Sequence, residues 1–399
     1  MGREDHVFEM KRGTEVPQMG DGPIPVTPYV DAAYFERERE KVFRRAWLQV
    51  ARAEDVPAAG DYLVQRIDAL NTSALIVRGS DGVIRAFHNA CTHRGNKVAL
   101  QPSGNARTFT CGFHGWVFGN TGELKMITGK EYFPESLREC DLGLRPLGCD
   151  TWNGFIFIHH DPQPAVGLRE FLGGMAEQLE HFPYERCERI ARYEATPRVN
   201  WKLAADAFQE AYHAIMVHRI SLPNSASGAD NPAACPTSAR FYGPHRSISA
   251  WANPGYRPPE TGMTVGKYGP SFATGRQIVP GTNPSDDENW WFDINVFFPN
   301  FFCDVGPGWY FTYNFWPVDV NHTRWTMDIY QFKSENAGAL LAAEHTKVLL
   351  RDAVLEDFGT LEDTQEMLES GALTHLQISE PEIALRHQLH VVDEWLARP

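Results

Sequence analysis

The sequence has 399 residues, more than one typical domain, so we expect two domains that each bury a core of their own. Hydrophobic residues make up 43% of the chain, but no run of 18 apolar residues occurs, which predicts a soluble globular protein and excludes a membrane-spanning one. The net charge of -14 argues against a nucleic-acid or anionic-membrane partner, because phosphate groups bind local positive charge.

The N-terminal 20 residues contain acidic side chains and no apolar segment, so they predict neither a signal nor a transit peptide. His6 stands where N-myristoylation would need Ser or Thr. We therefore expect a cytoplasmic protein. Five cysteines are scattered singly and are expected to be reduced thiols instead of disulfide partners: Cys140, Cys149, Cys187, Cys235 and Cys303.

The first 162 residues predict one helix and then a small all-β domain. Residues 31–46 place apolar side chains at helical spacing. Residues 62–67, 73–79 and 83–89 alternate as strands, with Asp81-Gly82 as a hairpin turn, and further strands are expected around 109–119 and 152–160. We place the β domain at 46–162, and residues 1–45 are expected to pack on the second domain.

Residues 163–399 predict an α+β domain. Helices are expected at 167–182, 200–218 and 335–369, and aromatic-rich strands at 290–317 and 322–332. Residues 225–290 are rich in Gly, Pro, Asn and Ser, which is typical of long loops around a site. The fold class expected for the whole chain is therefore α+β.

Two cysteine-histidine pairs form the motif C-x-H-x17-C-x2-H: Cys91 with His93, and Cys111 with His114. Two thiolates and two imidazoles could close a structural zinc site. Zinc modules usually pair like with like, whereas here each loop supplies one Cys and then one His. A Rieske 2Fe-2S cluster takes both thiolates on one iron and both imidazoles on the other. The stretch resembles the Rieske motif, including the neighbours Arg94-Gly95 and Gly115-Trp116.

A second constellation contains Glu210, His213 and His218. Residues five apart lie about 140° from each other on a regular helix, so the helix must end or bulge between the two histidines if they share a metal. Taken alone, this pair is weak support for a metal site, and two unrelated histidines are an equal alternative. A Rieske cluster elsewhere in the chain favours the metal, because a cluster that moves electrons needs a site that uses them.

Residues 200–218 resemble the iron-binding segment of Rieske non-haem iron oxygenases, in Asn200-Trp201-Lys202, Tyr212 and the H-x4-H pair. The resemblance implies Fe(II) bound by His213, His218 and one distant Asp, with positions open for dioxygen. Asp357 has apolar helical neighbours and fits the family pattern, although a water-reaching Asp is the alternative. The acidic candidates in this helix are Asp352, Glu356, Asp357, Glu362 and Asp363.

Glu210 could be an iron ligand, an acceptor for the His213 N–H, or a surface charge. The family implies a bridge from His213 to His93 or His114 of the next subunit in a head-to-tail trimer, with Asp206 as the alternative bridge. Most ring dioxygenases have Asp at this place, and Glu is frequent in relatives that act on quaternary amines or demethylate. A di-iron site would need a second E-x-x-H, which the sequence lacks.

The resemblance covers nearly the whole chain and implies the alpha subunit of a terminal oxygenase, with a Rieske domain and a helix-grip catalytic domain at 163–399. A reductase, directly or through a ferredoxin, would bring electrons from NAD(P)H, and O2 would cis-dihydroxylate an aromatic or other cyclic apolar substrate. The alternatives are a monooxygenase or demethylase and, more remotely, an electron carrier or redox sensor. A homotrimer is expected, with or without a beta subunit. Phe208, Ile215 and Met216 flank the histidines in the sequence, and the strands around Trp290, Phe297, Phe301 and Phe311 could line an aromatic cavity, although each of these residues is more often simply core.

Overall fold

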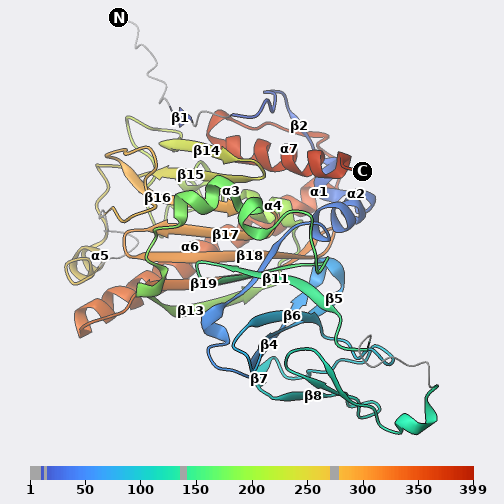
Figure 1. Cartoon of the computed structure of the whole chain (residues 1–399). Helices are drawn as coiled ribbons and strands as arrows, with labels where there is room; N and C mark the ends of the chain where they lie inside the picture. The colour runs from blue at the N-terminus through green and yellow to red at the C-terminus, as the bar shows by residue number, and fades with distance from the viewer. Residues whose placement is uncertain (1–9, 13–15, 135–141, 270–277) are drawn as a thin grey trace, which may run out of the picture. The chain divides into compact units, whose positions relative to one another are not determined.

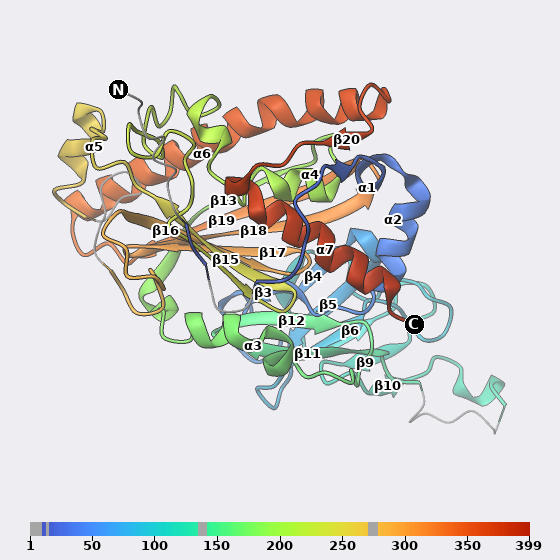
Figure 2. The same ribbon diagram turned by 90° about the horizontal axis from the view of Figure 1, so that it is seen from above.

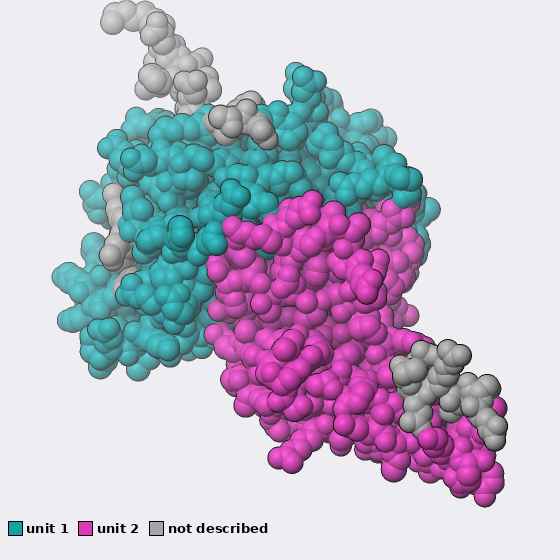
Figure 3. Space-filling view, in the orientation of Figure 1, with its two compact units in different colours: residues 1–38, 172–399 teal, residues 39–171 magenta. Residues whose placement is uncertain are grey.

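The computed structural model describes residues 10–12, 16–134, 142–269 and 278–399, so Cys140 lies outside the described residues. The chain forms two compact units, one of Arg39–Phe171 and one of Met1–Glu38 with Leu172–Pro399 (Figure 3). The segment predicted as the β domain, 46–162, lies within the first unit. The predicted N-terminal segment 1–45 is divided between the two units.

Unit Arg39–Phe171 is built of strands. In the larger sheet of this unit, β5 lies between β6 and β4. Four of its residues are fully buried: Ala74, Leu75, Ile76 and Val77. The sheet has the order β3-β12-β11-β6-β5-β4-β7, with β3 Leu48–Arg52, β4 Asp61–Ile67, β5 Thr72–Arg78, β6 Ile84–His88, β7 Ser103–Asn105, β11 Pro146–Trp152 and β12 Phe155–His159. A smaller sheet has the order β10-β9-β8, with β8 Thr108–Thr110, β9 Val117–Gly119 and β10 Leu124–Met126. The strands predicted at 62–67, 73–79, 83–89 and 152–160 are confirmed.

The second unit is organised around an eight-stranded sheet (Figure 1). Its order is β1-β14-β15-β16-β17-β18-β19-β13, and the described neighbours are antiparallel except for β1 and β14. The strands are β1 Lys11–Arg12, β13 Cys187–Ala195, β14 Ser238–Tyr242, β15 His245–Trp251, β16 Trp290–Phe297, β17 Phe301–Gly306, β18 Trp309–Asp319 and β19 His322–Phe332. The predicted aromatic-rich strands are confirmed, and β2 Ile24–Pro25 pairs with β20 His375–Leu376 outside this sheet.

Helices share one hydrophobic core with this sheet. Figure 2 shows the long helix α6, Ala337–Glu369, extended along the sheet. Its buried side chains include Ala353, Val354, Asp357 and Leu361. The other helices are α1 Thr27–Val30, α2 Ala32–Glu38, α3 Leu168–Leu179, α4 Trp201–Asp206, α5 Glu260–Val265 and α7 Ile383–Ala397. The mixture of antiparallel sheet and long helices confirms the predicted α+β class.

The helix predicted at 31–46 is confirmed over residues 32–43, where α2 continues as a π-helix, Arg39–Phe43. One other helix prediction is wrong in its length, and one helix was missed. The helix predicted at 200–218 ends at Asp206, before either histidine, and only a short 3-10 turn, His213–Ile215, follows. Helix α7 was not predicted, although its apolar residues, such as Leu385, Leu389 and Val392, recur at helical spacing and are buried.

Candidate active site

The two Cys-His loops have the same backbone geometry. The amide of Gly95 donates to the carbonyl of Cys91 at 2.8 Å, and the amide of Gly115 donates to the carbonyl of Cys111 at 2.9 Å. In both loops the amide of the Cys also donates to the carbonyl five residues further on. Both glycines have left-handed backbone angles, with φ of 80° and 70°, which other residues adopt only with strain. The repeated geometry turns both Cys and both His into one region.

The side chains of these loops fit a 2Fe-2S cluster. Cys91 and Cys111 are buried and not joined in a disulfide. The rings of His93 and His114 lie 4.6 Å apart between centroids, and His93 also stacks on Trp116. Nδ1 of His114 is buried with no hydrogen-bond partner in the described part of the chain. A buried nitrogen without a partner costs free energy, and iron would satisfy it.

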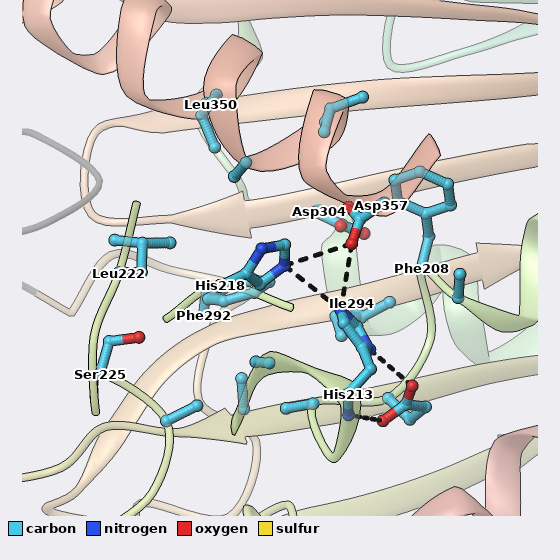
Figure 4. A pocket seen from close by; sticks show the side chains of 18 of the residues that line it. Phe208, His213, His218, Leu222, Ser225, Phe292, Ile294, Asp304, Leu350 and Asp357 are labelled. Carbon is cyan, nitrogen blue, oxygen red and sulfur yellow. Dashed lines mark hydrogen bonds and ion pairs between the residues drawn. The ribbon is translucent and has the colours of Figure 1, made fainter. Parts of the chain in front are cut away.

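A second group of ligand atoms converges in the sheet unit. Nε2 of His213 lies 3.3 Å from Nε2 of His218, and both lie 3.4 Å from Oδ1 of Asp357 (Figure 4). Among the described residues, these three side chains form the one group of His, Cys, Asp or Glu whose ligand atoms all lie within 4.8 Å of one another, close enough to hold a single ion. Ligand atoms at right angles on one ion, each about 2.1 Å from it, lie about 3 Å apart. The donor set of two imidazoles and one carboxylate therefore suits a ferrous ion.

The loop after α4 brings the histidines together. Asn200 caps α4 by accepting from the amide of Lys202 at 3.0 Å, and the helix ends after Asp206. His213 then begins a 3-10 turn, while His218 lies beyond its end. The predicted bulge between the histidines is thus an irregular segment that starts before both of them. This segment releases the two imidazoles from helical geometry.

Glu210 holds His213 through two hydrogen bonds. Oε1 lies 2.5 Å from Nδ1, and Oε2 accepts the backbone N–H of His213 at 3.1 Å. Because a carboxylate only accepts, Nδ1 carries the proton and Nε2 faces the other ligands. Burial lowers the pKa of His213, but the charge and hydrogen bond of Glu210, together with the charge of Asp357, outweigh it and raise that pKa to about 9. Among the roles considered for Glu210, the structure places it as an acceptor for the imidazole.

Glu356 holds the second histidine in the same way. Its Oε2 lies 3.0 Å from Nδ1 of His218 and also accepts from the hydroxyl of Ser221 at 2.6 Å. In the sequence, Glu356 is only one of five acidic candidate ligands in this helix. Its contact with His218 could have been predicted from its position directly before Asp357. Two adjacent residues in one helical turn can reach two neighbouring histidines.

Asp357 and Asp206 are both buried carboxylates with different surroundings. Burial raises the pKa of each to about 7. Oδ1 of Asp357 has no hydrogen-bond partner among the described residues, as expected for an atom that a metal would bind. Asp206 instead accepts from Tyr29, Gln209 and Gln388 at 2.8 to 2.9 Å. These bonds give Asp206 a structural role between α1, α4 and α7.

An apolar pocket opens beside the three ligand side chains (Figure 4). Phe208 and Phe311 line it, as the sequence suggested. The other suggested wall residues are not among its lining residues: Ile215, Met216, Trp290, Phe297 and Phe301. The indole N–H of Trp290 donates to Asp293 instead. The aromatic side chains that line the pocket are Phe208, Trp291, Phe292, Phe311 and Tyr313.

Comparison with known families decides the classification. The family described as "Ring hydroxylating alpha subunit (catalytic domain)" matches residues 184–398, more than half of the chain. The chain belongs to this ring-hydroxylating alpha subunit family. The family described as "Rieske [2Fe-2S] domain" matches residues 46–135. Together the two matches confirm the predicted family and its 2Fe-2S and mononuclear iron cofactors.

Individual relatives differ in the reaction that their names state. The chain is 34% identical over 201 residues to the 2-aminobenzenesulfonate 2,3-dioxygenase subunit alpha of Alcaligenes sp, a match that covers 47% of this chain and 48% of that protein. It is 31% identical over 198 residues to the carnitine monooxygenase oxygenase subunit of Acinetobacter baumannii, covering 49% and 52%. The chain thus spans about half the length of the curated relatives it matches.

The fold is shared over most of the chain with solved structures. A quaternary ammonium Rieske monooxygenase matches with a TM-score of 0.74 and 23% identity, over 94% of this chain and 95% of that one. At this identity the match shows the fold of the family member and not its substrate. Every helix in the described ranges is too short or too polar to cross a lipid bilayer.

Proposed function

We propose that this family member is a terminal oxygenase that receives electrons through a Rieske cluster at Cys91, His93, Cys111 and His114 and hydroxylates a substrate beside Fe(II). The observation that carries the proposal is the convergence of His213, His218 and Asp357, 3.3 to 3.4 Å apart, at the wall of an aromatic pocket. When bound, the cluster and the ferrous ion supply electron transfer and dioxygen activation.

The chain's own residues prepare the site for this chemistry. Glu210 and Glu356 fix the tautomers of the two histidines, so that each Nε2 presents its lone pair to the same point. Asp357 would add one negative charge to a bound ion, and a set of only three protein ligands would leave positions open for dioxygen. The aromatic walls bind an apolar skeleton and exclude water from the reacting atoms.

The reaction supported first is cis-dihydroxylation of an aromatic or other cyclic apolar substrate, which the five aromatic side chains of the pocket favour. Monooxygenation or demethylation is the second candidate. It is supported by Glu210, where the family pattern of ring dioxygenases has Asp, and by the similarity to the carnitine monooxygenase subunit.

The proposal includes a reductase, directly or through a ferredoxin, as the electron donor from NAD(P)H. It also includes a cytoplasmic homotrimer, with or without a beta subunit, in which Glu210 bridges His213 to His93 or His114 of the next subunit. The electron path would then cross between chains, and an oligomeric state other than a trimer would remove this part of the proposal.

The two reactions differ in the number of oxygen atoms that reach the product. Reduced holoprotein would be incubated under ¹⁸O₂ with naphthalene and, separately, with a methoxyaromatic such as anisole. A diol with two labelled atoms supports dihydroxylation, and a phenol with release of formaldehyde supports demethylation. Oxygen uptake without an oxygenated product from either probe would contradict both reactions for these substrate classes.

A further inference from the structure

Asp304 is a buried carboxyl group in the wall of the apolar pocket. It is 2% exposed and lines the same pocket as His213, His218 and Asp357 (Figure 4). The backbone N–H of Asn295 donates a hydrogen bond to this carboxyl group. Its Oδ1, however, has no hydrogen-bond partner in the part of the chain that the structure describes. A buried polar atom of this kind costs free energy unless a ligand satisfies it.

The sheet itself gives no reason for an aspartate at this position. The register pairs Asp304 directly with Phe311. The pairing of Asp293 with Val305 in the neighbouring strands places Ile294 on the other side of Asp304. The row across the sheet therefore joins Asp304 to four apolar residues: Ile248, Ile294, Phe311 and Ile329. Packing alone would favour an apolar side chain here.

The rest of the pocket supplies aromatic faces and negative charge. Five aromatic side chains line it, together with the carboxylates Glu210, Asp304 and Asp357. Neither Lys nor Arg occurs among the described lining residues. An anionic substrate group would therefore meet no protein cation in these walls. A cation would meet the carboxylate of Asp304, which neither the iron site nor a histidine uses, and the negative faces of aromatic rings.

The electrostatic surroundings of Asp304 agree with a cationic ligand. Burial raises the pKa of Asp304 well above its ordinary value, and the charge of Asp293 raises it further. The protein thus disfavours a bare carboxylate at this place. A bound cation would supply the missing counter-charge, since an opposite charge within a few ångströms favours the ionised form.

We propose that Asp304 recognises a protonated amine of the substrate, whose N–H donates to Oδ1 while the aromatic walls hold its apolar skeleton. The inference rests on the proposed function, because it names the substrate class for the same pocket. A pure hydrocarbon would leave Oδ1 without a partner. A quaternary ammonium would supply charge but no hydrogen-bond donor.

The test compares matched probes by anaerobic calorimetry on the full chain loaded with iron and cluster. The probes are 2-phenylethylammonium, its N,N,N-trimethyl derivative, and n-propylbenzene, which replaces the ammonium by a methyl group. The native protein should bind the protonated amine most tightly. Asp304→Asn should weaken binding of that amine on the order of 10- to 100-fold and leave n-propylbenzene unchanged, because a charged hydrogen bond is lost.

Asp304→Leu and Asp293→Asn complete the design. Asp304→Leu should bind n-propylbenzene in preference to the amine without a lower melting temperature, because it removes an unpaired polar group from an apolar row. Asp293 is equally buried, but Ser249, Trp290 and the amide of Asn283 satisfy it. Asp293→Asn removes a charge near Asp304 but no partner of the probe, so it should change stability and keep the protonated amine as the tightest of the three probes.

Three results would overturn the inference: no binding of the amine, equal binding of n-propylbenzene or of the quaternary probe by the native protein, or unchanged amine affinity in Asp304→Asn. Iron, labile sulfide and oxygen uptake would be measured on the same samples. If both iron centres and oxygen uptake are intact but the protein does not prefer the protonated amine, only the role of Asp304 is refuted. Absent centres refute the proposed function itself.

Discussion

Oε1 of Glu210 lies 2.5 Å from Nδ1 of His213, and Oε2 of the same carboxylate accepts the backbone N–H of that residue. The carboxylate thus fixes both the ring and the turn on which the ring stands. Removing it should loosen the iron site without removing a ligand.

Glu210→Ala is expected to weaken Fe(II) binding by about 10- to 100-fold, because a ligand histidine loses the group that orients it. Glu210→Gln keeps an acceptor oxygen and should lose less Fe(II) affinity than Glu210→Ala. Competition with a ferrous chelator measures the Fe(II) affinity of both variants. Glu366→Gln, an exposed change in α6, serves as the control. Native iron affinity in Glu210→Ala would show that the turn alone orients His213.

Glu356 should contribute in a similar way through His218. Glu356→Ala removes the acceptor for Nδ1 of His218 and leaves the Ser221 hydroxyl unpaired, so iron affinity should again fall by about 10-fold or more. Ser221→Ala removes only one of these bonds and should have a smaller effect. Equal losses in the two variants, measured by the same chelator competition, would contradict the assignment to His218.

Much of the fold and most of the candidate iron ligands could be predicted, because they depend on patterns among neighbouring residues. Strands such as β5 show a continuous run of apolar residues that predicts a buried strand. Asp81-Gly82 is a dipeptide typical of tight hairpin turns, so it predicts where the next strand begins. The end of α4 at Asp206 was missed, because residues 207–212 have acceptable helix propensity and contain no Gly or Pro that would end a helix. The pairing of Glu356 with His218 spans 138 residues, which no local pattern encodes.

The buried ion pair of Lys202 and Glu38 should control stability. Nζ and Oε1 lie 2.7 Å apart with both side chains fully buried, and the indole of Trp201 also donates to Glu38. Burial raises the pKa of Glu38 and lowers that of Lys202, and the partner opposes both shifts. Lys202→Met leaves a buried carboxylate without its cation and should cost about 3–5 kcal/mol of unfolding free energy.

The double variant Lys202→Met with Glu38→Leu removes both charges and should recover most of that loss. Thermal unfolding followed by calorimetry compares the two variants with the native protein. If the double variant were as unstable as Lys202→Met, the loss would come from packing around the aliphatic stem and not from the unpaired charge.

Removal of the mononuclear iron should lower the melting temperature of the protein. A metal that binds only the folded state stabilises it by about 2.7 kcal/mol when its free concentration is 100 times the dissociation constant. Added Fe(II) should therefore raise the melting temperature of the native protein. Asp357→Ala lacks one of the three ligands and should show a much smaller shift under the same anaerobic conditions.

Two different iron centres are expected in this chain, and one measurement tests for both. Iron and acid-labile sulfide would be determined on anaerobically purified native and Asp357→Ala protein, with EPR spectra before and after dithionite. We expect about three irons and about two sulfides per native chain, a rhombic Rieske signal after reduction, and selective loss of one iron in the variant. Zinc without sulfide, or a variant that retains all its iron, would contradict this expectation.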